Sequence, residues 1–236
     1  ALEFVPPQQL ASILSPHLND PTTAVRVEIA RVLASLPLDQ VDPSFTARLQ
    51  PLFEEYLRIL GTNADMPETQ LQFGIFFTAR QYWQPEEKAY QRALQLNPQF
   101  LPALLNLADL YRTLGKDKDA RELLQRGIEV APDQGAAYHA LGLLESRNGQ
   151  REKALEYLAQ AAQLEETGIR HRYVYAIALH DYGRQNASID QLKVLLRNAP
   201  HNLDVLMALV TYNQQLGQIE EARRYAARLR ELSPDD

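Results

Sequence analysis

The chain has 236 residues, of which 45% are hydrophobic and 23% are charged, so its composition is that of a folded protein rather than a disordered one. Its formal charge of −6, from 24 Lys and Arg against 30 Asp and Glu, argues against nucleic-acid binding that depends mainly on phosphate contacts. The absence of cysteine excludes disulfides, iron–sulfur clusters and thiolate zinc sites within the chain, and no apolar run approaches the roughly 20 residues that a membrane-spanning helix needs.

Residues 1–66 are predicted to form helices that differ from the rest of the chain. Asp20 precedes a proline, which is typical of a helix start, because the carboxylate accepts hydrogen bonds from free backbone N–H groups and proline fits the first turn. Asp42 also precedes a proline and predicts another helix, which we expect to kink or restart at Pro51. These residues therefore indicate a leading helical segment.

From residue 67 onward the sequence repeats with a period of 34 residues. Glycines recur at Gly115, Gly149, Gly183 and Gly217. Five residues after each glycine stands a small side chain: Ala120, Ala154, Ser188 and Ala222. Prolines close the units at Pro98, Pro132, Pro200 and Pro234. We expect each glycine to end a helix in a left-handed conformation, and each small residue to let two helices approach closely.

This pattern resembles the tetratricopeptide repeat, whose unit of 34 residues is a helix–turn–helix. The resemblance implies an all-α fold, a right-handed α-solenoid of helical hairpins that forms one continuous superhelix. The expected units are residues 67–100, 101–134, 135–168, 169–202 and 203–236. The unit 67–100 departs from the pattern, because Gln81 stands where the other units have the turn glycine.

The leading segment carries a second, shorter resemblance. Asp20 followed by Arg26 is similar to the second helix of a HEAT repeat, in which an Asp–Arg pair joins neighbouring units. HEAT-like helices that run into tetratricopeptide repeats are similar to the C-terminal part of bacterial multihaem cytochrome c proteins. That resemblance implies a haem-bearing part outside this chain, and the start at Ala1 without a methionine is interpreted as an excised or processed piece.

No pattern of catalytic residues is found in the chain. It contains no nucleophile elbow, phosphate-binding loop, dinucleotide fingerprint or zinc-protease motif. His171 and His180 are nine residues apart on one predicted helix, so they should point to opposite sides and cannot share a metal. Adjacent residues do not face each other on a helix, so His180 and Asp181 are not expected to form a dyad. We therefore predict no enzyme activity, no cofactor and no metal.

The last predicted helix carries arginines interspersed with glutamates. The arginines are Arg223, Arg224, Arg228 and Arg230. They could bind an anionic partner or RNA. The glutamates instead favour a solvated outer face, because a terminal repeat has no neighbour to cover it. We adopt the capping interpretation, which would place Asp236 near a true C-terminus.

The resemblance implies a concave groove lined by the first helices of successive hairpins. Carried over residue by residue, the candidate peptide-binding residues are Asp109, Arg112, His139, Arg147, Tyr173, Ile177, His180, Thr211 and Gln214, and the same positions include Leu143. The most specific patch is expected around His139, Arg147, Tyr173 and His180. Both histidines should gain charge near pH ~6, so an acidic ligand should bind more tightly at lower pH.

Three functional hypotheses follow. The leading one is a non-catalytic scaffold that binds a protein or peptide in the groove, without nucleic acid and without insertion into a membrane. The second is a repeat module of a multihaem cytochrome c protein that docks an electron-transfer partner, and the third is an oligomerisation module. The identity of the ligand, the oligomeric state and the compartment, bacterial periplasm or cytoplasm, are left open.

Overall fold

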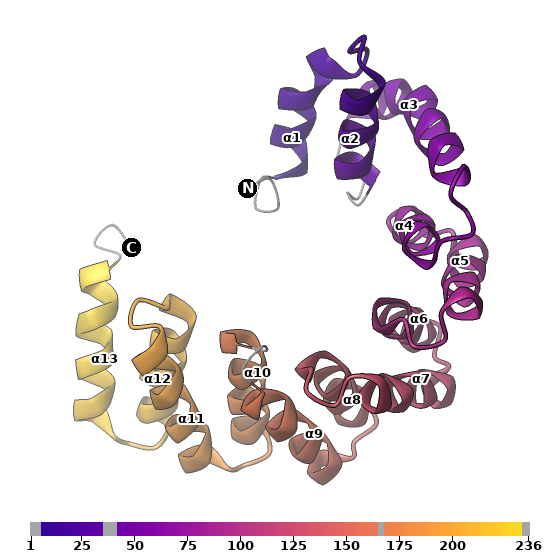
Figure 1. The fold of residues 1–236 in the computed structure, drawn as a ribbon. Coiled ribbons are helices and arrows are strands. Elements are labelled where there is room, and N and C mark those ends of the chain that lie inside the picture. Colours follow the sequence, from indigo (N-terminus) through magenta and orange to yellow (C-terminus); the bar gives the residue numbers. More distant parts are fainter. Residues whose placement is uncertain (1–5, 35–41, 165–167, 233–236) are drawn as a thin grey trace. The chain divides into compact units, whose positions relative to one another are not determined.

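The computed structural model describes residues 6–34, 42–164 and 168–232. Over these residues the chain forms thirteen α-helices, one short 3₁₀ helix and no strand, which confirms the predicted all-α class (Figure 1). The chain divides into two compact units, Ala1–Leu114 and Gly115–Asp236. Among the described helices, none is both long and apolar enough to cross a bilayer.

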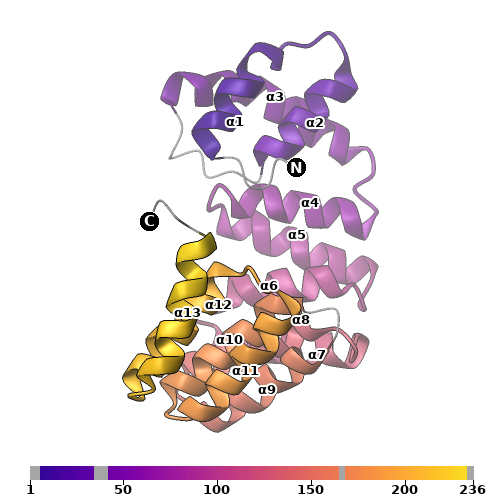
Figure 2. The same cartoon turned by 90° about the vertical axis from the view of Figure 1, so that its left-hand side faces the viewer.

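The first unit contains six α-helices. They are α1 (Pro7–Leu14), α2 (Thr23–Ala34), α3 (Pro43–Gly61), α4 (Pro67–Thr78), α5 (Trp83–Leu96) and α6 (Leu101–Thr113), with the 3₁₀ helix η1 (Ser15–His17) after α1. The helices α4 and α5 lie side by side as a hairpin in both orientations (Figures 1 and 2). Buried side chains of α1 to α4 form one apolar core, which includes Leu33, Leu49, Phe53, Tyr56 and Phe76.

The two predicted helix starts of this unit have different outcomes. Asp42 is the N-cap of α3, since its carboxylate accepts hydrogen bonds from the backbone N–H groups of Ser44 and Phe45, as predicted. The Asp20 carboxylate instead accepts from the N–H of Thr22 in the turn before α2, at 2.8 Å. The expected restart at Pro51 is wrong: α3 continues through it, with Pro51 exposed and the apolar face on both sides of it packed into the same core. A kink at Pro51 stays a prediction.

Arg26 does not make the aspartate pair that the HEAT resemblance implies. Its Nε and Nη2 donate to the two carboxylate oxygens of Glu55 on α3, at 2.8 and 2.6 Å. Its Nη1 donates to the backbone carbonyl of Asp20, at 2.6 Å. The arginine therefore joins α2 to α3 through a glutamate distant in sequence.

Arg80 ties three helices of the first unit together. Its Nη1 donates to the carbonyl of Ala34 at the end of α2, at 2.7 Å, and to that of Phe76 on α4, at 3.0 Å. The guanidinium also lies over the rings of Phe76, at 3.8 Å, and Phe53 of α3, at 4.1 Å. Burial lowers the pKa of Arg80 to about 10, so the group remains charged at neutral pH. No motif in the sequence predicted this contact.

The second unit contains seven α-helices. They are α7 (Asp117–Val130), α8 (Gly135–Arg147), α9 (Arg151–Gln163), α10 (Gly168–Asp181), α11 (Gln185–Asn198), α12 (Leu203–Gln215) and α13 (Ile219–Leu232). Three hairpins, α8–α9, α10–α11 and α12–α13, stack in succession. Figure 1 shows α8, α10 and α12 in one layer, with α9 and α11 in a second layer below it in this view.

The turn glycines adopt the expected backbone conformation. Gly115, Gly149, Gly183 and Gly217 have φ between 71° and 82°, in the left-handed region that costs other residues steric strain. Gln81 occupies the same place in the α4–α5 turn and also has a positive φ, 57°. The tetratricopeptide turn is therefore retained there without its glycine. Pro234 and Asp236 lie outside the described residues.

Small residues mark the places where the helices of a hairpin touch. A Cβ atom at Gly142 of α8 would lie 2.6 Å from the Cγ atom of Leu158 on α9, closer than real carbon atoms approach. A Cβ at Gly74 of α4 would lie 2.1 Å from the Tyr90 ring of α5. Ala154 of α9 is fully buried. The helices of these two hairpins thus approach closely at Gly142 and Gly74, and Ala154 of the predicted small-residue column is buried.

Gln81→Gly should stabilise the protein. A left-handed conformation costs an ordinary residue roughly 1–2 kcal/mol. Glycine removes this strain, but it loses more conformational entropy on folding, which cancels part of the gain. We therefore expect the free energy of unfolding to rise by about 0.5–1 kcal/mol. Urea denaturation followed by circular dichroism measures the change. Gln91→Gly, within α5, is the control and should lower stability. A loss of stability in both variants would contradict the strain at Gln81.

Ala154→Leu should destabilise the α8–α9 hairpin. The added methyl groups have no space in the fully buried site, and overpacking of this kind costs roughly 1–3 kcal/mol. Glu156→Leu, at an exposed position of the same helix, should change stability by less than about 0.5 kcal/mol. Equal midpoints for the two variants in thermal denaturation would show that the assignment of inner and outer faces is wrong.

Candidate functional site

A cleft of about 230 Å³ lies between the first helices of two successive hairpins in the second unit. Leu143 and Ser146 line it from α8, and Leu158 closes it from α9. From α10 and the turn after it come Tyr173, Val174, Ile177, Ala178, Asp181 and Tyr182. Gly142 keeps α9 close to α8, which brings Leu158 of α9 to the cleft.

The walls of this cleft combine apolar and polar groups. Leu143 is 43% exposed, so its side chain is open to solvent where it lines the cleft. Opposite the apolar part, the hydroxyl groups of Ser146 and Tyr182 are hydrogen-bonded at 2.5 Å. The Arg151 guanidinium lies 5.5 Å from the Tyr182 ring, and the Asp181 side chain is 62% exposed. The cleft can thus accept an apolar side chain beside hydrogen-bonding groups and one carboxylate.

Three residues at the predicted groove positions line this cleft: Leu143, Tyr173 and Ile177. Tyr173 is only partly accessible, because it also packs against the core formed by α11, α12 and α13. Burial, with a smaller effect of Asp204, raises the pKa of Tyr173, so its hydroxyl stays protonated at neutral pH. Tyr173 therefore has both a structural role and an exposed edge.

His139 does not line the cleft, contrary to the prediction. Its side chain is buried, and its ring lies 4.4 Å from that of His171 on α10 in an edge-to-face arrangement. Burial, together with the charges of His171 and Arg170, lowers the pKa of His139 to about 4. The expectation that His139 gains charge near pH 6 is therefore wrong, because desolvation favours the neutral ring.

His180 connects α10 to α12. Its ring stacks on Tyr212 with a centroid separation of 3.6 Å, and its Nε2 lies 2.6 Å from the Oε1 of Gln215. Burial raises the pKa of Tyr212 to about 12. The expected separation of His180 from Asp181 is wrong, since Nδ1 and Oδ1 are 3.4 Å apart. As predicted, His171 and His180 have different neighbours.

The remaining predicted residues are dispersed. Arg147 lies 3.3 Å from the Asp117 carboxylate of α7. Thr211 and Gln214 are exposed on α12. Asp109 and Arg112 form an ion pair of 2.7 Å on α6, in the first unit. The second unit thus brings together Leu143, Tyr173 and Ile177, but not the whole predicted set.

Six cleft residues were not among the predicted groove positions: Ser146, Leu158, Val174, Ala178, Asp181 and Tyr182. Ser146 occupies the same place in its repeat as the predicted Arg112 and His180, so the register of the repeats contained the signal for it. Tyr182 directly precedes a turn glycine, outside that register. Over the described residues, no group of three or more His, Asp or Glu side chains is placed to hold a metal ion.

The pKa of His139 predicts a loss of stability in acid. A histidine whose folded-state pKa is about 4, against 6.5 as the ordinary value, stabilises the folded state fully above pH 6.5. That stabilisation is lost as the pH falls towards 4, by roughly 2–3 kcal/mol in total. His139→Leu should flatten this part of the stability profile in urea titrations, whereas His201→Leu, at an exposed site, serves as the control. An unchanged profile in His139→Leu would contradict the assignment.

Two family models described as tetratricopeptide repeat match this chain, one at residues 87–142 and one at residues 135–167. Among curated proteins, anaphase-promoting complex subunit 3 of Schizosaccharomyces pombe (strain 972 / ATCC 24843) is 24% identical over 121 residues. The match covers 50% of this chain and 18% of the relative, so the chain spans less than a fifth of that protein.

Solved tetratricopeptide-repeat structures share the fold at low identity. YrrB, described as a TPR protein with an unusual peptide-binding site, has a TM-score of 0.55 and 17% identity, over 75% of this chain and 92% of its own. MamA has a TM-score of 0.60 and 18% identity, over 71% of this chain and 92% of its own. The chain therefore carries tetratricopeptide repeats, and its fold class is an α-solenoid of helical hairpins.

Proposed function

We propose that this chain is a non-catalytic scaffold that binds an extended segment of another protein in the cleft between α8 and α10. The observation that carries the proposal is the open apolar wall of that cleft, with Leu143 43% exposed opposite Tyr173 and Ile177. Helical-repeat proteins bind peptides along such surfaces, and YrrB, which shares the fold, is described as having a peptide-binding site.

The lining indicates the chemistry of the bound segment. A volume of about 230 Å³ accommodates one or two aliphatic side chains. The hydrogen-bonded hydroxyl groups of Ser146 and Tyr182 can also bond to the backbone of the segment. The exposed carboxylate of Asp181 favours a neighbouring Lys or Arg. The proposed ligand is an apolar residue with a basic residue beside it, not the acidic ligand expected when His139 was assigned to the groove.

The finer hypotheses remain predictions. They are the HEAT-like character of residues 1–66, a single continuous superhelix over 67–236, the multihaem cytochrome origin and the oligomerisation module. A haem-attachment motif encoded upstream of Ala1 would support the cytochrome origin.

Leu143→Gln should weaken peptide binding by about tenfold or more, because it removes an apolar contact worth at least about 1.4 kcal/mol. The probe is a peptide selected from a phage-displayed random library on the full chain, and titration calorimetry gives its affinity. Ile219→Gln, at a 46% exposed apolar position of α13 outside the cleft, is the matched control and should bind as the wild type does.

Both substitutions are at exposed positions, so circular dichroism and the melting temperature should stay close to those of the wild type. Selected peptides should be enriched in an apolar residue next to Lys or Arg. Equal affinity of the Leu143→Gln and Ile219→Gln variants, or enrichment of acidic peptides that Leu143→Gln does not weaken, would move the binding site away from the α8–α10 cleft.

A further inference from the structure

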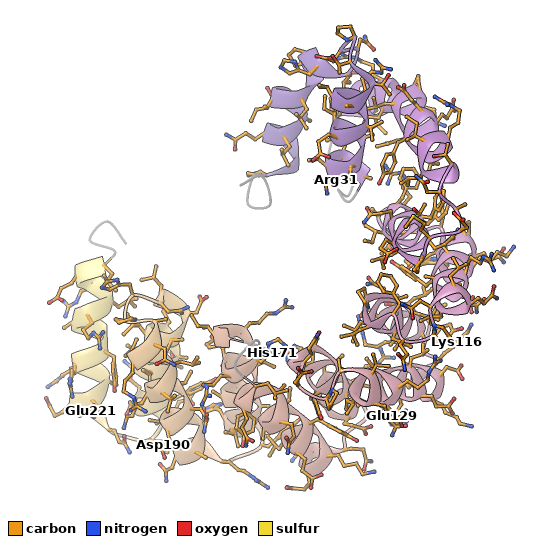
Figure 3. All side chains as sticks on the ribbon, viewed as in Figure 1. Arg31, Lys116, Glu129, His171, Asp190 and Glu221 are labelled. Atoms are coloured by element: carbon orange, nitrogen blue, oxygen red, sulfur yellow. The ribbon has the colours of Figure 1, made fainter. Side chains whose placement is uncertain are left out.

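A second cleft, of about 410 Å³, lies between α11 and α13 in the second unit. Four cationic side chains line it: Lys193 and Arg197 from α11, and Arg224 and Arg228 from α13. One carboxylate, Glu221, is present among them. Figure 3 labels Glu221 near the start of α13, at this second cleft. It labels His171 on α10 beside α8, the two helices that form the first cleft. The cleft therefore concentrates positive charge in a chain whose net charge is −6.

These cations are largely unneutralised by the protein itself. The Arg224 guanidinium is 4.0 Å from Glu221, a loose pair whose arginine side chain is 71% exposed. Arg228 donates to the backbone carbonyl of Pro200, at 3.1 Å. Within the described part of the chain, neither Lys193 nor Arg197 has an ion-pair or hydrogen-bond partner for its side chain. The cleft thus retains several free N–H donors.

The repeat does not require cations at these positions. One repeat earlier, between α9 and α11, the four equivalent residues are Ala159, Gln163, Asp190 and Val194. Two repeats earlier, between α7 and α9, they are Gln125, Glu129, Glu156 and Gln160. The same backbone arrangement therefore forms with neutral or acidic side chains, and packing of the hairpins does not explain the four cations between α11 and α13.

The floor of this cleft is apolar and buried. Leu196 is 6% exposed and Tyr225 is 6% exposed, and both belong to the core of the hairpins α10 to α13. A rigid floor holds in place the backbone ends of the cationic side chains around it. Guanidinium groups on such a support can donate two parallel hydrogen bonds to one carboxylate, which is stronger and more directional than a single contact.

We propose that the α11–α13 cleft binds an acidic segment of a partner protein, separately from the α8–α10 cleft. Carboxylate side chains of the segment pair with Arg197 and Arg224, and an apolar residue between them contacts the floor at Leu196 and Tyr225. The cleft is short and contains Glu221, and the rest of the chain is acidic, so an extended nucleic-acid strand would be repelled over most of its length.

Fluorescence anisotropy with the full chain tests this proposal. The probe is a labelled peptide of alternating Glu and Gly with one central Leu, and the same peptide with Gln in place of Glu is the neutral control. The double variant Arg197→Gln with Arg224→Gln should bind the acidic peptide about tenfold to a hundredfold more weakly, the loss expected for two charge-assisted pairs. The neutral peptide should not bind at these concentrations.

A second double variant, Arg223→Gln with Arg230→Gln, removes the same charge from exposed positions of α13 that do not line the cleft. It should retain binding within about threefold of the wild type, because only the long-range field changes. Equal losses in the two double variants would mean nonspecific attraction and would overturn the proposal. Failure of the acidic peptide to bind, or tighter binding of a single-stranded oligonucleotide of matched charge, would also overturn it.

Discussion

The close approach of the two helices within each hairpin is the constraint on which the rest of the fold depends. At Gly142 no side-chain atom is tolerated, since Leu158 already occupies the space, and Gly74 lies equally tightly against Tyr90. The buried Ala154 meets the same requirement from the opposite helix. The exposed apolar face of such a closely packed hairpin must be covered by the next hairpin.

Much of this architecture could be predicted from the sequence, because the determinants are local and repeat every 34 residues. The turn glycines, the small-residue columns and the hairpins all follow from that register. The repeat register is strong enough that Gln81 adopts the left-handed conformation of the turn without being glycine. The unpredicted features, the Arg26–Glu55 pair and the contacts of Arg80, depend on residues far apart in the sequence. No local pattern reveals such partners.

The candidate sites were harder to predict for the same reason. A groove position in the repeat register specifies a side of the helix, but the neighbouring hairpin decides what remains accessible. Tyr173 and Ile177 reach the cleft, whereas His139 is covered by His171. The α11–α13 cleft depends on Lys193 and Arg197 of α11 lying opposite Arg224 and Arg228 of α13. In the sequence only the arginines of α13 form a cluster, and the glutamates between them make that cluster typical of a solvated outer face.

The proposed function requires a partner segment to occupy the α8–α10 cleft. The most direct test is photo-crosslinking, with a benzophenone side chain introduced at position 143 of the full chain and, as the control, at position 219. Irradiation with a peptide selected on the wild-type protein, followed by mass spectrometry, identifies the attached site. We predict that the peptide crosslinks at position 143 through its apolar residue and not at position 219. Crosslinking at position 219 alone, or equally at both, would contradict the account.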